Sequence, residues 1–314
     1  MKTITLLVPC YNESESLNAL YSALQRIIKS SPMYKWEILF VNDGSRDNTI
    51  DVIKRLRSQD RSISYVDLSR NFGKEAAMLA GFDYAAGDAV IVLDADLQDP
   101  PSLIPEMIKW WKEGYDDVYA KRKSRGRESW IRKKLSLLYY SLLQKTTKID
   151  ILQNVGDFRL LDRKCVEELK KLRESERYTK GMFCWIGYKK KEVLFDRDDR
   201  IGGESSFNLF KLTNLAIEGI TSFTIAPLRI STIIGLVVSM FAFVYMVFVL
   251  LKAILYGDPV QGYPTLMTVI LFLGGVQLLS LGIIGEYLGK VFNETKNRPV
   301  YVINEVVIGD ESES

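Results

Sequence analysis

Two long segments without a charged residue constrain the fold of this chain more than any other feature. They cover residues 230–251 and 266–284, and Gln277 is the one strongly polar side chain of the second. A helix that spans a bilayer needs about 20 predominantly apolar residues. The alternative is a pair of core helices in a soluble domain, but such helices rarely run so far without a charge. The sequence therefore predicts two transmembrane helices.

The charges around these segments predict a hairpin, residues 229–290, with both termini in the cytoplasm. The connection 252–265 holds one Lys and one Asp. The outer flanks are basic, and cytoplasmic flanks of membrane helices carry an excess of Lys and Arg. These flanking residues are Lys211, Arg229, Lys290, Lys296 and Arg298.

The rest of the chain divides around this hairpin. We expect a cytosolic domain over 1–206, an amphipathic helix on the membrane surface over 207–228, and a cytosolic tail over 291–314, whose acidic end is disordered. The N-terminus lacks the pattern of a signal peptide, so we expect the first domain to stay where it is made.

The absence of histidine limits the chemistry. No Ser-His-Asp triad, histidine base or histidine-ligated zinc site can form, so proton transfer falls to carboxylates, Lys, Tyr or Cys. The three cysteines, Cys10, Cys165 and Cys184, include no CxxC pair. This pattern excludes a disulfide framework and favours a reducing compartment.

Strand and helix patterns alternate over the first 120 residues. Apolar β-type runs occupy 4–8, 37–42, 64–68, 89–93 and 117–120. Helical patterns occupy 17–28, with Ser14 as a plausible N-cap, then 74–85 and 101–111. This rhythm predicts an α/β fold, a mostly parallel sheet with helices on both faces. Ligands of such sheets bind at the carboxyl ends of the strands.

The strongest chemical signal is Asp94-Ala95-Asp96, directly after an apolar strand. Two carboxylates one residue apart can direct oxygens to one point, which suits Mg²⁺ or Mn²⁺ and a substrate diphosphate. The alternative interpretation is a solvated turn. The position at a strand end favours the metal site.

A second signal, Asn42-Asp43-Gly44-Ser45, also follows a strand. The Asp43 carboxylate is suited to accept hydrogen bonds from a base or ribose, although the motif by itself is also typical of a simple turn. No strand is followed by GxGxxG and no P-loop is present. These absences argue against NAD binding and P-loop ATPase activity.

Two further features allow several interpretations. Residues 121–134 hold eight Lys or Arg against Glu128. They suit a solvated loop or a nucleic-acid patch, but beside a membrane hairpin the better interpretation is attraction to anionic headgroups or a lipid phosphate. Asp157, between Gly156 and Phe158, is either a loop cap or a site residue, depending on whether it returns to the mouth of the sheet.

The ordered motifs together resemble a known enzyme family. They are Val-Pro-Cys-Tyr-Asn-Glu at 8–13, Val-Asn-Asp-Gly-Ser at 41–45, Lys-Glu-Ala-Ala at 74–77 and Asp-Ala-Asp-Leu-Gln-Asp at 94–99. This set resembles the inverting family 2 glycosyltransferases of GT-A (Rossmann-like) fold, and within them the polyprenyl-phosphate branch, which includes the bactoprenol glucosyltransferases and dolichol-phosphate mannose synthase. The similarity covers essentially the whole chain, hairpin included.

The resemblance implies roles for individual residues. Asp157 and Asp96 are implied to be catalytic, with Asp157 at the position often assigned as the base. The implied nucleotide-sugar site is Pro9, Tyr11, Glu13, Asp43, Lys74 and Asp94. The implied metal ligands are Asp94, Asp96 and Gln98, and the implied acceptor-phosphate residues are Arg122, Arg132, Lys133 and Arg200. Ser206 departs from the family, which often has Lys there.

The implied reaction is inverting transfer of a hexose from a UDP-sugar to polyprenyl (undecaprenyl) phosphate, with Mg²⁺ or Mn²⁺. Glucose is the favoured sugar and the lipid product is β-linked. The resemblance also implies a multi-pass protein of the inner membrane, a homo-tetramer, a part in O-antigen modification of lipopolysaccharide, and no nucleic-acid partner.

Alternatives are another donor (GDP-mannose or a different UDP-sugar), a processive polysaccharide synthase, and a lipid-carrier flippase or non-catalytic scaffold. The synthase normally has Gln-x-x-Arg-Trp and more spans. Two helices make a poor translocation path, and an inactive scaffold has no reason to keep the acidic set.

Overall fold

The computed structural model describes residues 1–123, 152, 155–175, 177–195, 226–256 and 262–309. The chain forms two compact units, one from Met1–Leu209 with Arg298–Ser314 and the other from Phe210–Asn297. The expected surface helix up to residue 225, and all of the basic stretch beyond residue 123, lie outside the described residues.

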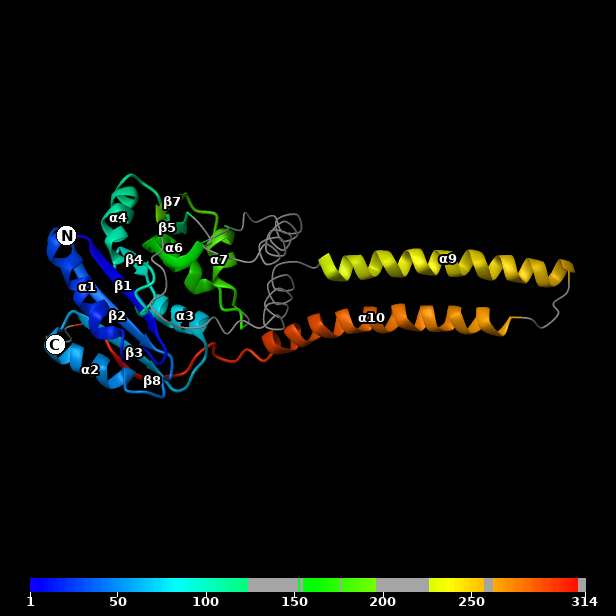
Figure 1. Ribbon diagram of the computed structural model, residues 1–314, viewed down its shortest axis with the longest axis horizontal. Coiled ribbons are helices and arrows are strands. Elements are labelled where there is room, and N and C mark those ends of the chain that lie inside the picture. The colour runs from blue at the N-terminus through cyan, green and yellow to red at the C-terminus, as the bar shows by residue number, and fades with distance from the viewer. Residues whose placement is uncertain (124–151, 153–154, 176, 196–225, 257–261, 310–314) are drawn as a thin grey trace. The chain divides into compact units, whose positions relative to one another are not determined.

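The first unit is built around an 8-stranded sheet with the order β7-β5-β6-β4-β1-β2-β3-β8 among the described residues (Figure 1). The pairs β1–β2, β1–β4, β2–β3 and β5–β7 are parallel, and β4–β6, β5–β6 and β3–β8 are antiparallel. The sheet is mostly parallel, as predicted. Its strands are β1 (Thr3–Cys10), β2 (Lys35–Asn42), β3 (Ile63–Leu68), β4 (Ala89–Val92), β5 (Asp117–Arg122), β6 (Val155–Asp162), β7 (Lys190–Phe195) and β8 (Ile303–Val307).

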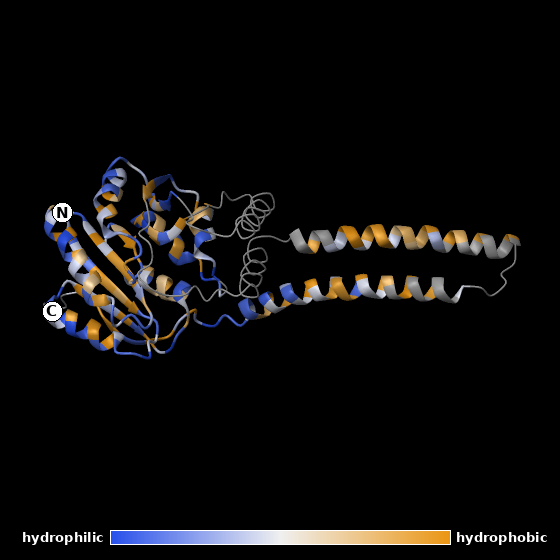
Figure 2. Ribbon diagram, in the orientation of Figure 1, coloured by the Kyte–Doolittle hydropathy of each residue, from blue (hydrophilic) through white to orange (hydrophobic). Residues whose placement is uncertain are grey.

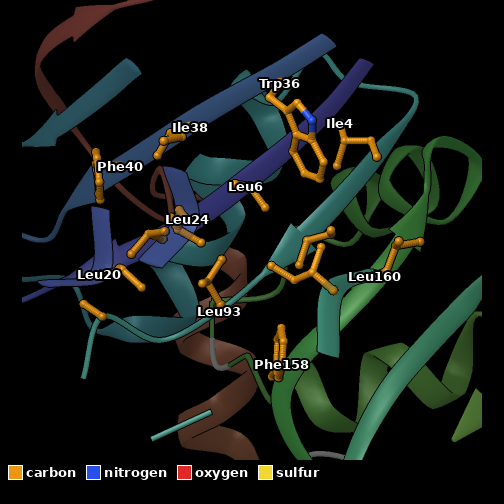
Figure 3. Close-up of a cluster of buried hydrophobic side chains, with 14 of the residues drawn as sticks. Ile4, Leu6, Leu20, Leu24, Trp36, Ile38, Phe40, Leu93, Phe158 and Leu160 are labelled. Carbon is orange, nitrogen blue, oxygen red and sulfur yellow. The ribbon is translucent and has the colours of Figure 1, made fainter. Parts of the chain in front are cut away.

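Helices cover both faces of the sheet because its central strands are apolar on both sides. One face packs against α1 (Leu17–Ser30), α2 (Thr49–Gln59) and α4 (Ile104–Lys112), which follows the short 3₁₀ turn η1 (Pro101–Leu103). The side chains of this core include Ile4, Leu6, Phe40 and Phe158 (Figure 3).

The opposite face of the sheet packs against α3 (Lys74–Tyr84) and α6 (Arg163–Lys171), and α7 (Thr179–Trp185) follows in the chain. Helix α3 lies very close to β1, because a Cβ placed on Gly81 would be only 2.1 Å from a methyl carbon of Leu7. A glycine at this point therefore lets the helix that begins with Lys74 sit directly over the central strand.

The five strands expected from the sequence are present, with ends that differ by up to two residues. The expected N-cap at Ser14 is wrong. Helix α1 begins at Leu17, because the Glu13 carbonyl accepts the N–H groups of Ser16 at 3.1 Å and Leu17 at 3.2 Å and so closes a turn before the helix. The Ser14 N–H is used elsewhere, donating to Asp47.

Strand β6 determines where Asp157 lies. It runs antiparallel to β4, with Val92 opposite Arg159 and Ala89 opposite Asp162. The start of β6 therefore lies beside the carboxyl end of β4, at the edge where parallel α/β sheets bind ligands. Asp157 therefore lies at the mouth of the sheet, which favours a site residue over a loop cap.

The second unit contains two long helices, α9 (Ala226–Tyr256) and α10 (Tyr263–Thr295), which lie side by side (Figure 1). Figure 2 shows that both are predominantly apolar. Large apolar side chains are exposed along them, including Leu236, Phe241 and Leu278. Of the described helices, one segment, Phe272–Thr295, is long and apolar enough to cross a membrane, and Ser231–Tyr245 is a shorter apolar stretch.

The structure divides the chain differently from the boundaries expected at the C-terminal end. Helix α10 continues to Thr295 rather than ending near residue 290, and Ile303–Val307 forms β8 on the edge of β3. Residues 298–309 are thus part of the first unit and not a separate tail. The backbone groups at the edge of β3 need partners, and β8 supplies them.

Candidate active site

A pocket opens at the carboxyl ends of β1, β2 and β4 and at the N-terminus of α3. Seven of its lining residues were singled out in the sequence: Pro9, Tyr11, Glu13, Asp43, Lys74, Asp94 and Asp96. The other five lining residues, to which no site role was assigned from the sequence, are Cys10, Asn71, Gly73, Ala77 and Ala95. The six residues proposed for the nucleotide sugar, which include Asp94, therefore share one pocket with Asp96.

Lys74 links two of the acidic residues. Its Nζ lies 2.6 Å from a carboxylate oxygen of Asp94 and 2.6 Å from one of Asp157. Burial opposes the charged ammonium, but the two carboxylates outweigh it and raise the pKa of Lys74. Lys74 is thus a fixed positive charge between the β4 and β6 carboxylates.

Asp157 is almost fully buried, with 10% of its side chain exposed. Burial alone would raise the pKa of Asp157, but Lys74, with Lys180 and Arg159, outweighs burial and lowers it. Asp157 is therefore ionised at neutral pH. Its Oδ2 pairs with Lys74, and its Oδ1 is buried without a hydrogen-bond partner among the described residues. Asp157 is not itself among the residues that line the pocket, and it contacts the pocket through Lys74.

Asp94 and Asp96 present hard oxygen ligands to the pocket. Between Asp96 and Gln98, Leu97 has a φ of 58°, and the Gln98 N–H donates to Asp96 Oδ1 at 3.0 Å. Burial raises the pKa of Glu13, and Asp96 and Asp94 raise it further, which indicates excess negative charge around the pocket.

These residues fit a divalent cation held partly by substrate. Carboxylate oxygens and concentrated negative charge suit Mg²⁺ or Mn²⁺. In the part of the chain that the structure describes, no three acidic or cysteine side chains lie close enough together to hold a metal ion by themselves. Substrate phosphate and water would complete the coordination. Gln98, proposed as a third ligand, is not among the lining residues.

Asp43 has a structural role in addition to lining the pocket. Its two carboxylate oxygens accept the backbone N–H groups of Phe72 at 2.7 Å and Gly73 at 2.9 Å. Burial raises the pKa of Asp43, although these hydrogen bonds act in the opposite direction. Asp43 thus fixes the turn that leads into Lys74 while it also lines the pocket.

The loop after β2 packs tightly on that same turn. Gly44 has a φ of +59°, and a Cβ there would lie 2.2 Å from the carbonyl carbon of Arg70. Only glycine fits both the conformation and the space. This close packing explains why Asn71 and Gly73 belong to the pocket, a feature that no motif marked.

The loops after β1 and β2 are joined by polar side chains. The Glu13 N–H donates to Thr49 Oγ1 at 2.8 Å, and the Ser14 N–H donates to Asp47 at 3.2 Å. Burial acts to raise the pKa of Asp47, but hydrogen bonds from Thr49 and Ser14 lower it to about 2. The two loops that carry Tyr11, Glu13 and Asp43 are therefore held together in advance of any ligand.

The proposed acceptor residues are only partly described. Arg122 Nη2 lies 3.8 Å from the buried carboxylate of Asp99, and Arg122 Nε is buried without a hydrogen-bond partner among the described residues. Arg132, Lys133 and Arg200 lie outside the described residues. The structure therefore associates Arg122 with the Asp-x-Asp segment through Asp99.

Two contacts that no sequence motif predicted involve the chain neighbours of Lys74 and Asp157. Arg159 and Asp117 form an ion pair at 3.1 Å, with side chains 2% and 0% exposed. Glu75 accepts the Thr179 N–H at 2.9 Å, which fastens the first turn of α3 to α7. The signal for the first contact was a charged residue in each of two apolar strands, β5 and β6, and the second left no sequence signal.

Comparison with known proteins places the chain in a family. The profile described as "Glycosyl transferase family 2" matches residues 5–170, and the one described as "GtrB C-terminal hairpin" matches 226–291. An uncharacterized glycosyltransferase of Synechocystis sp. is 46% identical over 303 residues, 96% of this chain and 95% of that protein.

Two further relatives carry a more specific description. The SfII prophage-derived bactoprenol glucosyl transferase of Shigella flexneri is 44% identical over 96% of this chain and 97% of that protein. A prophage bactoprenol glucosyl transferase homolog of Escherichia coli is 45% identical over 96% and 99%. The GT-A-like sheet and the family suggested by the motifs are thus confirmed, and the chain belongs to glycosyl transferase family 2.

Proposed function

We propose that this enzyme transfers glucose from UDP-glucose to a polyprenyl phosphate, undecaprenyl phosphate in bacteria, with inversion at the anomeric carbon. The observation that carries the proposal is the pocket lined by Lys74, Asp94 and Asp96, in which Lys74 pairs with Asp94 and with the neighbouring Asp157. Relatives described as bactoprenol glucosyl transferases, aligned over nearly their whole length, favour glucose and a lipid phosphate.

The nucleotide would lie across the loops after β1 and β2. Pro9, Tyr11 and Glu13 come from the first loop and Asp43 from the second. Asp94 and Asp96 would hold Mg²⁺ or Mn²⁺ with the diphosphate, and such a cation supplies stabilisation of the leaving phosphate charge. Lys74 adds a positive charge at the same place.

The acceptor needs little base catalysis. A phosphate monoester has a second pKa of about 6 and is already largely ionised at neutral pH. A phosphate oxygen attacks the anomeric carbon on the face opposite the diphosphate, the bond from that carbon to the diphosphate oxygen breaks, and UDP leaves. Asp157 orients the reacting groups through its ionised carboxylate, and the product is β-linked.

Positive charge near the Asp-x-Asp segment would bind the acceptor phosphate. Arg122 beside Asp99 is the described candidate, and we assign Arg132, Lys133 and Arg200 the same task. A homo-tetramer, as the resemblance suggests, would be checked by mass measurement in detergent.

We place the enzyme in the cytoplasmic membrane, with both apolar helices spanning it and both ends of the chain in the cytoplasm. The pairing of β8 with β3 supports this topology, because it requires residues before and after the helices to share one compartment. Labelling of single cysteines placed near Lys2 and Asn304 would test it, in a background that retains the three buried native cysteines.

A transfer assay tests the reaction. Membranes containing the enzyme are supplied with polyprenyl phosphate and labelled UDP-glucose, UDP-galactose, UDP-N-acetylglucosamine or GDP-mannose, and lipid is extracted. We expect label in the lipid from UDP-glucose only, and none after chelation of divalent cations. Label from another donor would correct the sugar. No label from any donor, with Mg²⁺ or Mn²⁺ present, would contradict the proposal.

A further inference from the structure

A continuous chain of hydrogen bonds leads from β8 to the β2 loop. Asn304 Nδ2 donates to Asp67 Oδ2 at 2.7 Å, and Asn42 Nδ2 donates to Asp67 Oδ1 at 2.6 Å. Ser45 Oγ then donates to Asn42 Oδ1 at 2.6 Å. Asp67 and Asn42 are almost fully buried, so each has few other partners available.

The chain continues into the loop after β1. Ser45 Oγ accepts the Asn12 N–H at 3.0 Å, and Asn12 Oδ1 accepts the Arg46 N–H at 2.8 Å. Asn12 has a φ of 56°, a conformation that these two bonds hold in place. Its neighbours Tyr11 and Glu13 line the pocket, as does Asp43 next to Asn42.

Strand β8 is fastened to the first unit by contacts outside this chain. Glu305 accepts hydrogen bonds from Lys54 at 2.5 Å and from Tyr65 at 2.9 Å. Tyr301 donates to Asp83, and the Ser69 N–H donates to the Val302 carbonyl. Loss of the Asn304 bond therefore leaves the strand docked, which allows its effect on the pocket to be separated from its effect on folding.

We propose that Asn304 and Asp67 are positioning residues for the nucleotide-sugar donor. Asn304 fixes the Asp67 carboxylate, Asp67 orients the Asn42 amide, and Asn42 and Ser45 hold the two loops at the spacing that a nucleoside diphosphate requires. Residues that follow the apolar hairpin thus act on donor affinity. The inference rests on the proposed function only in taking this pocket as the donor site.

The test reverses which side chain donates in the hydrogen bond between Asn304 and Asp67. Asn304→Asp sets a second carboxylate against Asp67, whereas Asn304→Asp combined with Asp67→Asn restores a donor and an acceptor and leaves Asn42 an oxygen to bond. Glu305→Gln is the matched control, since it weakens the neighbouring contacts of the same strand without touching the chain. Full-length variants in detergent are compared by calorimetric binding of UDP with Mn²⁺ and by transfer kinetics.

We expect Asn304→Asp to raise the Kd for UDP and the donor KM about fivefold, the scale of coupling within one hydrogen-bond network, with kcat little changed. The double variant should recover most of the affinity, and Glu305→Gln should bind UDP as the wild type does. An unchanged Kd for Asn304→Asp, or no recovery in the double variant, would overturn the inference. Wild-type enzyme that binds no nucleotide would contradict the proposed donor site itself.

Discussion

Lys74 Nζ lies 2.6 Å from Asp94 and 2.6 Å from Asp157, two residues on antiparallel neighbouring segments that are far apart in the sequence. The contact exists because β6 begins where β4 ends and because α3 begins directly above them. A single ammonium therefore pairs with two carboxylates, one just after β4 and one in β6.

Replacing Lys74 should change the pH dependence of transfer. In the wild type the ammonium keeps the pKa of Asp157 low against the effect of burial. In Lys74→Met burial acts with less opposition, so the pKa of Asp157 rises and activity on the acid side is lost at a higher pH. We also expect kcat to fall by about 100-fold, the scale for removing one preorganised charge or donor.

The measurement is kcat/KM against pH, with Lys74→Arg as the control that retains a positive charge. The acid limb of Lys74→Arg should stay close to that of the wild type. If kcat/KM of Lys74→Met falls in acid at the same pH as that of the wild type, the group whose protonation causes the fall is not Asp157.

Asp96→Asn should remove the response to divalent cations. Asp96 lines the pocket and contributes a carboxylate to the proposed metal site. We expect transfer to fall by at least about 100-fold, with a parallel loss of Mn²⁺ binding in the presence of UDP by calorimetry. Asp51→Asn, on the exposed side of α2, should retain both. Retained cation-dependent activity in Asp96→Asn would remove Asp96 from the metal site.

Gly44→Ala should destabilise the enzyme much more than Gly114→Ala. Both glycines have positive φ, +59° and +87°, which costs a non-glycine residue about 1–2 kcal/mol. A Cβ at Gly44 would also overlap the Arg70 backbone, whereas nothing lies within 4 Å of one at Gly114. Overpacking adds about 1–3 kcal/mol. Urea unfolding of both variants measures the difference, and equal losses would contradict the packing of the β2 loop on the turn before α3.

Asp47 should contribute stability that disappears in acid. Its pKa is lowered from 3.8 to about 2 in the folded protein, so its contribution is complete above about pH 4 and declines as the pH falls toward 2. Asp47→Asn lacks this titration. The difference in urea midpoint between wild type and Asp47→Asn should therefore shrink from pH 4 to pH 2, and a difference independent of pH would exclude the assignment. Asp51→Asn is the control.

The sheet and most of the pocket could be predicted because their signals are local. Each apolar run followed by a polar turn marked a strand and its carboxyl end, and parallel strands bring those ends together. Asp43 and Asp94 were found in this way, whereas Pro9 and Lys74 were named from the resemblance to the enzyme family. The motif set then added the family, which composition could not provide.

The features missed were those that depend on pairing between distant segments. The direction of β6 decides whether Asp157, which the sequence left open as a loop cap or a site residue, can contact Lys74, and no local pattern records strand direction. The residues of β8 were expected to belong to a C-terminal tail, and their role as an edge strand appears only from their pairing with β3. Asp43 was expected to bind ligand, but its oxygens also accept the N–H groups of Phe72 and Gly73. This second role depends on a tertiary contact that the sequence does not show.

Strand β8 also has a consequence for biosynthesis. The edge of β3 stays bare while the ribosome makes the two apolar helices, because the segment that covers it is translated after them. An uncovered edge strand pairs readily with other chains. A protein shortened before residue 226 would leave that edge uncovered permanently. Such a fragment, which lacks the two apolar helices, should therefore aggregate unless residues 298–309 are joined to it again.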